Sequence, residues 1–437
     1  MNIFMKGFVV GVIFAGLLSH AAYAVTRVGE CPVFPANHIL NSRIDALPVH
    51  PNSNAFIQTI STNGKALHLD LGIETDQSSS DYYGIPYNLV SGNSVKWKPI
   101  TFDSNQASPD ESDCAVDEGG GHQVKSPCIG ADSAPLTNVV LPIPDSPQVE
   151  SGTVTSDDGN DHHLLVIDTD ACNLWEIYSA IKNNSGWLVT SSIAFFDLRS
   201  NALRPLGWTS SDAAGFPIYP LLLKATEANS GSIEHALRLT LLSSKIRRGD
   251  PFWPARHNTG RGSGNNVPQM GQVFRLKASY VIPGNFHPQS IAILTAMQRY
   301  GIYLSDIGSD MFVQGEPNSA WEQTTFDEVQ HVTSQEFEAV DISPIMNAAG
   351  FDSNSAAVPA VLGSAGSSGA GTNESNDSGN VHSTAKHGCA ATSTNDIQVF
   401  FLGYWLLSLY HRKNRTRCFV EINFIMKKSR CGFRAFS

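Results

Sequence analysis

The chain has 437 residues and a formal net charge of −11, with 41% hydrophobic and 16% charged residues. So few charges exclude a coiled coil or a charge-rich disordered protein, and the length allows one large domain with a sizeable core. Nucleic-acid binding is not expected, because it requires clustered Lys and Arg and the body of this acidic chain has no basic stripe. The 36 glycines and 23 prolines indicate many turns, which favours β architecture.

Residues 1–24 have the layout of a secretory signal peptide. Lys6 supplies the positive charge, Phe8 to Leu18 form an apolar run, and Ala22-Tyr23-Ala24 places small residues at a cleavage site. The alternative is an uncleaved anchor helix, although the run is shorter than the ~20 residues of a membrane span. We therefore expect the following domain to be exported to the cell surface or periplasm, with extracellular release as an alternative.

Residues 25–345 carry the predicted fold. Alternation of apolar and polar residues predicts strands at 66–72, 171–180, 193–198 and 273–280, and the apolar run at 163–168 predicts a buried central strand. Further strand candidates are 84–90, 217–223, 234–242, 302–304 and 311–313. An amphipathic helix is expected from Pro288 to Tyr300, and Trp321 to Val332 is a second candidate. Residues 54–60 fit a short helix or an edge strand, and 211–214 fit the start of a short helix. This pattern predicts one mainly-β domain, an antiparallel β-sandwich or jelly roll with one or two helices.

The C-terminal part divides into three zones. Residues 346–388 are rich in Ser, Gly, Ala and Asn and predict a disordered linker. Residues 389–417 begin at Cys389, continue as an apolar run and end in a basic cluster, and 418–437 form a further basic tail. The middle zone resembles bacterial surface-sorting tails, which implies a sorting or lipidation role for Cys389 and contact with the inner membrane or sorting machinery. The alternative is a plain membrane anchor, with the basic cluster kept in the cytoplasm.

Four cysteines fall in the predicted exported body. An even number in an oxidising compartment predicts disulfide bonds, and four cysteines allow three pairings. We favour Cys114–Cys128, which would close a short acidic, glycine-rich loop, together with Cys31–Cys172. The alternative is free, buried thiols.

Several sequence phrases together resemble a family of secreted, largely uncharacterised proteins of bacteria and some fungi. The phrases are Cys31–Pro35 (CPVFP), Gly84–Tyr87 (GIPY), Asp168–Glu176 (DTDACNLWE), Phe196–Pro205 (FDLRSNALRP), Gly207–Ser210 (GWTS), Ala296–Gly301 (AMQRYG) and Asp306–Ser309 (DIGS). The resemblance covers most of residues 31–342. It implies one extracellular domain and assigns no catalytic residue.

One candidate catalytic group lies at the end of the predicted strand 163–168. Asp168 and Asp170 would project on one face of an extended chain, and Glu176 follows closely. Glycoside hydrolysis requires two carboxyl groups, one of them kept protonated by a dry environment. Trp175 and Tyr178 could stack on sugar rings. The alternative is that both aspartates form turns and bind backbone amides.

A second candidate lies in a loop rich in Pro and Gly. His257 is a candidate catalytic acid or base, and Arg256 and Trp253 are candidate substrate-binding residues. The alternative is a loop anchored by Trp253, with Arg256 paired to a surface carboxylate.

No cofactor or metal is expected. His162 and His163 point to opposite faces of a strand and cannot chelate together. The Gly262-x-Gly264 pattern follows no predicted strand, so a nucleotide-binding loop is rejected.

The leading hypothesis is an exported, surface-attached domain that acts on an extracellular polysaccharide as a hydrolase or lyase. The alternative is a non-catalytic module that binds glycans or serves in adhesion.

Overall fold

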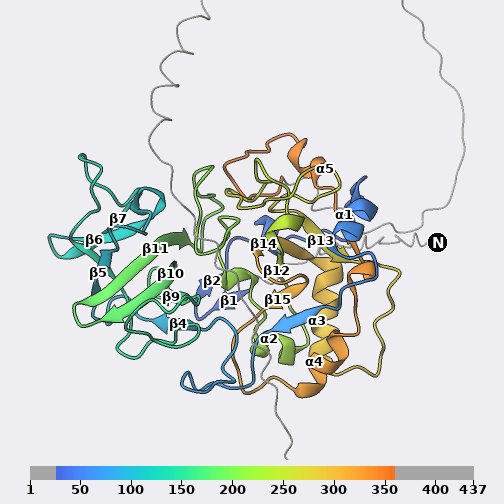
Figure 1. Cartoon of the computed structure of the whole chain (residues 1–437), viewed down its shortest axis with the longest axis horizontal. Helices are drawn as coiled ribbons and strands as arrows, with labels where there is room; N and C mark the ends of the chain where they lie inside the picture. Colours follow the sequence, from blue (N-terminus) through green and yellow to red (C-terminus); the bar gives the residue numbers. More distant parts are fainter. Residues whose placement is uncertain (1–25, 360–437) are drawn as a thin grey trace, which may run out of the picture. The chain divides into compact units, whose positions relative to one another are not determined.

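The computed structural model describes residues 26–359. This part of the chain forms sixteen β-strands and five α-helices, which confirms the prediction of a mainly-β domain with few helices. Only α1 (Ser53–Ile60) and α3 (Pro288–Arg299) have eight or more residues. Most strands belong to two large sheets that lie side by side, and β1 (Arg27–Val28) pairs separately with β2 (Cys31–Pro32) (Figure 1).

The larger sheet has eight strands built around the long hairpin of β10 and β11. Its order is β4 (Tyr87–Val90), β9 (Leu164–Asp168), β10 (Asn173–Asn183), β11 (Gly186–Asp197), β5 (Lys98–Phe102), β8 (Val139–Leu141), β6 (Cys114–Glu118) and β7 (Gly121–Lys125). Strands β9 and β11 flank β10 in antiparallel pairing. β4 and β5 are added in parallel at the two sides.

The smaller sheet has six strands. Its order is β16 (Phe337–Ala339), β13 (Val273–Leu276), β14 (Ile302–Ile307), β12 (Leu237–Leu241), β15 (Phe312–Gln314) and β3 (His68–Asp70). Between β12 and its parallel neighbour β14, the chain passes through β13 and α3. Such crossovers permit parallel pairing, so both sheets are mixed and not purely antiparallel as in the predicted sandwich.

The side chains of β9 and β10 point alternately into two hydrophobic cores. Leu165 and Ile167 belong to a core shared with the six-stranded sheet, whereas Leu164 and Val166 belong to a second core that also contains Trp175. Successive residues of a strand point to opposite faces, so the two cores lie on opposite faces of this part of the sheet.

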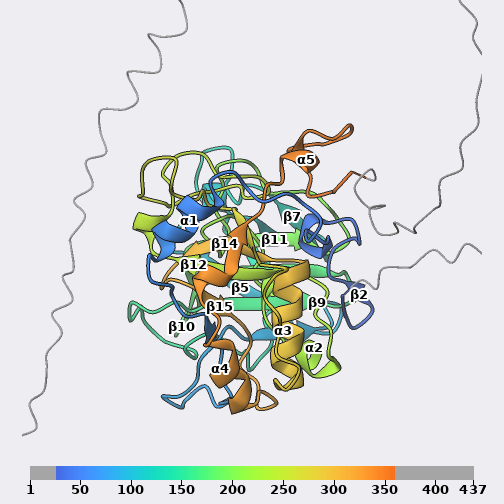
Figure 2. The same cartoon turned by 90° about the vertical axis from the view of Figure 1, so that its right-hand side faces the viewer.

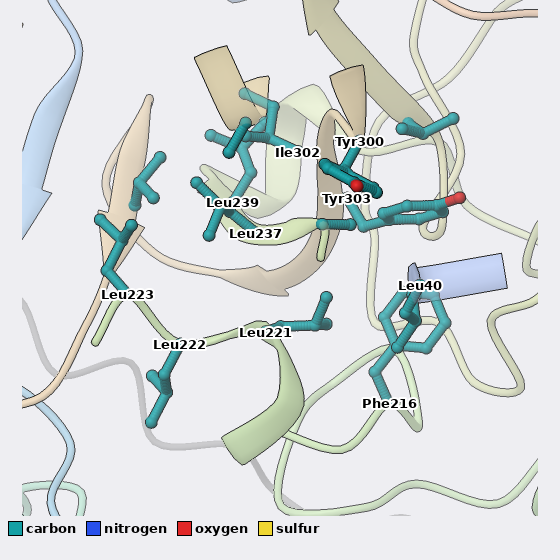
Figure 3. Close-up of a cluster of buried hydrophobic side chains, with 14 of the residues drawn as sticks. Leu40, Phe216, Leu221, Leu222, Leu223, Leu237, Leu239, Tyr300, Ile302 and Tyr303 are labelled. Atoms are coloured by element: carbon teal, nitrogen blue, oxygen red, sulfur yellow. The ribbon is translucent and has the colours of Figure 1, made fainter. Parts of the chain in front are cut away.

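The larger core is built from segments that are distant in sequence. Figure 3 shows Leu221 and Leu223 beside Leu237 and Leu239 of β12, all of them fully buried. The segment 217–223 was predicted as a strand, but Tyr219–Leu221 form a 3₁₀ turn because Pro217 and Pro220 cannot donate to a strand ladder. It lines the core as a loop.

The predicted helix at 288–300 is confirmed by α3. Pro288 occupies its first position, His287 Nδ1 accepts from Gln289 N, and Gly301 follows with a φ of +78°. Helix α3 packs against β13, α2 (Ala225–Ser230) and α4 (Gln323–Val329), and Figure 2 shows it upright in front of the sheet. The last helix is α5 (Ser343–Met346).

Two disulfide bonds are formed, Cys31–Cys172 and Cys114–Cys128. Both predicted pairings are therefore confirmed. The first joins the N-terminal strand β2 to the turn between β9 and β10, and the second closes the loop around the β6–β7 hairpin. Disulfide bonds of this kind point to an oxidising, extracellular environment.

The packed domain continues beyond the predicted boundary at residue 345. Ile39 N donates to Ala356 O at 2.8 Å, Val358 N donates to Asn37 O at 2.8 Å, and Ala356 is fully buried. The linker predicted from residue 346 therefore does not begin there, because residues 346–359 have backbone partners in the domain.

The remaining predictions on the chain ends lie outside the described residues. They concern the signal peptide at 1–24, the linker beyond residue 359, the segment 389–417 with Cys389, and the tail 418–437. Within residues 26–359, none of the helices has the length and hydrophobicity needed to cross a membrane.

Candidate functional site

Asp168 and Asp170 shape the turn after β9. Asp168 is buried, and its Oδ1 accepts hydrogen bonds from the N–H groups of Gly92, Asp170 and Ala171 at 2.9, 3.0 and 3.3 Å. Asp170 is exposed and accepts from Ser91 Oγ at 2.6 Å, which holds the pKa of its carboxyl below the usual range. Asp168 and Asp170 therefore stabilise a turn through hydrogen bonds, as in the alternative prediction, and they do not form a catalytic pair.

Glu176 lies on the opposite face of the sheet from Asp168. Asp168 continues the alternation of Leu164 and Val166, on the side of the second core, whereas Glu176 follows Leu174 on the side of the larger core. The predicted group of three carboxyl groups is therefore not assembled.

Trp175 is 1% exposed and packs against Phe195 with ring centroids 4.7 Å apart. A residue buried in this way cannot stack on a sugar, so its predicted role in substrate binding is wrong.

The second predicted group is structural. Arg256 is buried and donates to Ser353 O at 2.8 Å, and Trp253 Nε1 donates to Ser355 O at 3.1 Å. His257 Nδ1 contacts another backbone carbonyl at 2.9 Å. Trp253 and Arg256 fix segment 353–355 on the domain, whereas His257 contacts Ala213 O. The predicted catalytic and substrate-binding roles of these three residues find no support in their contacts.

A different group of polar side chains lies between the two sheets, and we call it the inter-sheet cluster. Its members are Asp70, Glu150, Asp161, His163, Glu176, Tyr178, Ser211, Asp212, Arg238, Asp306 and Gln314. They come from β3, β10, β12, β14 and β15 and from the loops before β9 and after β11.

Arg238 is the centre of this cluster. It lies on β12, between two strands of the sheet, and its side chain is fully buried. Its Nη2 lies 3.1 Å from Asp212 Oδ2 and 3.2 Å from Asp306 Oδ2, and its Nη1 donates to Gln314 Oε1. Gln314 is paired with Asp70 across the parallel strands β15 and β3. The sheet register thus places one cation among several acidic or amide groups.

Two carboxyl groups share the single charge of Arg238. Burial raises the pKa of Asp212 well above its ordinary value, against the opposing effect of Arg238, and the charge of Asp306 raises it further. Burial also raises the pKa of Asp306, whose Oδ1 accepts from Ile307 N at 2.7 Å. One proton shared between the two carboxyl groups relieves the repulsion of a second negative charge.

His163 and Glu150 form a second ion pair in the cluster. His163 is buried, its Nδ1 donates to Glu150 Oε2, and its Nε2 donates to Ser211 O at 2.9 Å. Burial lowers the pKa of His163, but the charge of Glu150 outweighs it and raises the value to about 9. Since Ser211 directly precedes Asp212, this pair fixes the backbone that carries the buried carboxyl group.

Glu176 is a third acidic group with an unusual pKa. Its carboxyl accepts from the N–H groups of Ile218 and Tyr219, each at 2.9 Å. Burial raises its pKa to about 7, although these hydrogen bonds and the charges of His163 and Arg238 favour the ionised form. Glu176 is therefore partly protonated at neutral pH, and the charges of His163 and Arg238 influence its ionisation.

Some buried polar atoms of this region have no hydrogen-bond partner among the described residues. They are Asp212 Oδ1, Ser211 Oγ and Tyr82 OH. Buried polar atoms are almost always paired, and the exceptions require a reason such as a ligand or an ordered water. The cluster also reaches the surface, since Asp70, Tyr178 and Gln314 are half-buried and Tyr178 OH donates to exposed Asp161 at 2.9 Å.

Sequence reasoning identified Glu176 and Tyr178 but not Asp212, Arg238 or Asp306. The available signal was a charged residue inside an apolar strand, as Arg238 is in LRLTL and Asp306 is in IYLSDI. Charges are seldom buried without a partner, so both residues indicate a buried pair of opposite charges. Their partner Asp212 lies in a loop, where an aspartate is ordinary.

The sequence matches no protein-family model, and no curated protein and no solved structure is significantly similar to it. Among residues 26–359, no three His, Cys, Asp or Glu side chains are grouped as metal ligands.

Proposed function

We propose that this protein is an exported hydrolase of an extracellular polysaccharide, with Asp212 and Asp306 as its catalytic carboxyl groups. The main support for this proposal is the burial of Asp212 and the incomplete hydrogen bonding of its carboxyl group. It is fully buried, one carboxyl oxygen contacts Arg238, and the other is unpartnered. Perturbed carboxyl groups of this kind are concentrated at catalytic sites.

The separation of the two carboxyl groups supports a retaining mechanism. Their Oδ2 atoms lie 3.1 and 3.2 Å from the same Arg238 Nη2, so these oxygens cannot be farther apart than the sum of the two distances. Inverting glycosidases need about 6.5–9.5 Å between carboxyl groups, to leave room for a water, whereas retaining enzymes need about 5–5.5 Å.

In the proposed reaction, Asp212 is the general acid, because burial keeps it protonated. Asp306, whose side chain is 20% exposed, attacks the anomeric carbon, while Asp212 gives its proton to the departing glycosidic oxygen. Asp212 then takes a proton from water, and the hydroxide displaces Asp306 and releases the sugar. Arg238 stabilises the negative charge that moves between the two groups.

The half-buried residues around the pair are suited to a polyhydroxylated ligand. Asp70 and Gln314 offer carboxylate and amide groups to sugar hydroxyls, and Tyr178 offers an aromatic ring 5.1 Å from that of His163. The two disulfide bonds and the signal-like segment 1–24 support export. Attachment to the cell surface through the segment 389–417 remains part of the proposal.

The test is digestion of a polysaccharide panel, with reducing ends as the readout. We expect Asp212→Asn and Asp306→Asn to lower the rate by at least about 100-fold. The matched control is Asp170→Asn, which changes an exposed carboxyl that caps a turn and should keep most of the activity. Equal losses in all three variants, or the absence of any cleavage by the wild-type protein, would refute the proposal.

A glycan-binding module without catalysis is the second candidate. It is favoured by the fact that Arg238, His163 and Glu176 are all held by partners within the domain. This candidate predicts that the wild-type protein binds a glycan of the panel and leaves it intact.

A further inference from the structure

Three arginines surround an open hollow outside the inter-sheet cluster. Arg247, Arg248 and Arg261 line it, together with glycines such as Gly249 and Gly264, and its volume is about 560 Å³. It lies in the loops between β12 and β13. None of these arginines takes part in the proposed hydrolysis.

The backbone that carries the arginines is fixed. Arg247 and Gly262 form a parallel bridge, Arg248 N donates to Gly262 O at 2.9 Å, and Arg261 N donates to Ser243 O at 2.7 Å. A Cβ atom on Gly262 would lie 2.6 Å from Ser244 O, a distance that real Cβ atoms do not tolerate. Only glycine therefore permits this close packing, which holds the three arginines around one space.

Helix α1 anchors the outer part of the same loop. Thr59 Oγ1 donates to Asn266 O at 2.6 Å, and Asn52 Nδ2 donates to Asn265 O at 3.1 Å. The hollow is thus bordered by a loop with fixed contacts on both sides.

The positive charge of the hollow is not compensated. Within residues 26–359, no carboxylate forms an ion pair with Arg247, Arg248 or Arg261, whereas Arg238 and Arg275 are each paired. The chain as a whole carries a net charge of −11, so three unpaired arginines in one place are a marked departure from its average.

The charge also affects a neighbouring residue. Burial lowers the pKa of His50, and Arg247 lowers it further, while Asp341 acts in the opposite direction. Arg247 is therefore close enough to His50 to disfavour a further positive charge beside the hollow.

We infer that this hollow binds the carboxylate or sulfate groups of an acidic polysaccharide. Guanidinium groups donate paired hydrogen bonds that match such oxyanions, and glycine backbone lets an anion approach closely. The choice of a polysaccharide rests on the proposed function. The inference specifies that the substrate is an acidic polysaccharide. A protein of net negative charge repels a polyanion, so it needs a local site of this kind to retain one.

The experiment measures binding of polygalacturonate, dextran sulfate, neutral dextran and inorganic sulfate by calorimetry at two salt concentrations. We expect the wild-type protein to bind one of the two acidic polymers, more weakly at high salt, and not to bind neutral dextran. Arg248→Gln combined with Arg261→Gln should weaken this binding by about tenfold or more. Both residues are exposed, so the fold should persist.

The control is Arg27→Gln combined with Arg199→Gln, which removes the same charge from exposed arginines that pair with Glu30 and Asp197. Equal weakening in both double variants, tight binding of neutral dextran, or binding of inorganic sulfate alone would overturn the inference. Asp212→Asn separates the two proposals, because it should abolish cleavage and leave polymer binding intact. If the wild-type protein binds the polymer but cleaves nothing, the hydrolase fails and the anion site stands.

Discussion

Asp212 Oδ2 lies 3.1 Å from Arg238 Nη2, and both side chains are fully buried. Asp212 lies in a loop after β11, and Arg238 lies in strand β12. Burying the charge of Arg238 is costly unless it has specific partners, and here Asp212 and Asp306 both contact the guanidinium. In this domain the pair joins the loop 207–216 to the six-stranded sheet.

Removing the cation should destabilise the domain strongly. Arg238→Met leaves Asp212 and Asp306 without their shared partner, and we expect a loss of about 3–5 kcal/mol in the free energy of unfolding. Urea unfolding followed by tryptophan fluorescence measures this. Arg199→Met removes an exposed arginine paired with Asp197 and should cost no more than about 1 kcal/mol. Similar losses for both variants would contradict the central role of Arg238.

The fold could be predicted from the sequence where the signal is local. Helix α3 has a proline at its start and a glycine after its end, and β9 is a short run of apolar residues that is typical of a buried strand. The oxidising compartment predicted disulfide bonds and the short loop favoured Cys114–Cys128, and the structure forms this favoured pairing. The parallel pairings of β12 with β14 and of β15 with β3 join distant segments, and no local pattern specifies them.

The candidate site was harder to predict because it depends on which face each residue occupies. Asp168 and Glu176 are eight positions apart in sequence, yet the turn between β9 and β10 places them on opposite faces of one sheet. The partners of Glu176, at Ile218 and Tyr219, follow only from the packing of a distant loop. Sequence proximity of acidic residues therefore misled the prediction of the catalytic group.

The two disulfide bonds should differ in their contribution to stability. Cys31–Cys172 closes a loop with a sequence separation of 141, and Cys114–Cys128 one with a separation of 14. Loop-closure entropy predicts losses of about 5 and about 3 kcal/mol for the paired Cys→Ser variants. Denaturant unfolding of each double variant checks the order. A larger loss for the short loop would show that entropy of the unfolded chain does not dominate.

Glu176 should make the domain less stable as the pH rises from acidic to neutral. Its pKa in the folded state is about 7, above the ordinary value of 4.5, so the folded state binds more protons in this interval. The stabilising contribution is complete below pH 4.5 and is lost as the pH rises through 7. Glu176→Gln should flatten this part of the stability curve. An unchanged slope between pH 4.5 and 7 in the variant would contradict the assignment.

The ion pair of His163 and Glu150 should act in a more alkaline interval. Burial disfavours the charge of His163, but Glu150 raises its pKa from 6.5 to about 9. The contribution of the pair to stability is therefore complete below pH 6.5 and disappears as the pH rises through 9. Glu150→Gln removes the anion, so the variant should lose stability at pH 6 and show little further change up to pH 9.5. Thermal unfolding at half-unit pH steps measures both curves, with Asp170→Asn as a control because Asp170 is an exposed carboxyl that accepts from Ser91 Oγ. If the wild-type curve stays level between pH 6.5 and 9 while the Glu150→Gln curve follows it, His163 is neutral in the folded protein and does not fix the loop of Asp212 by charge.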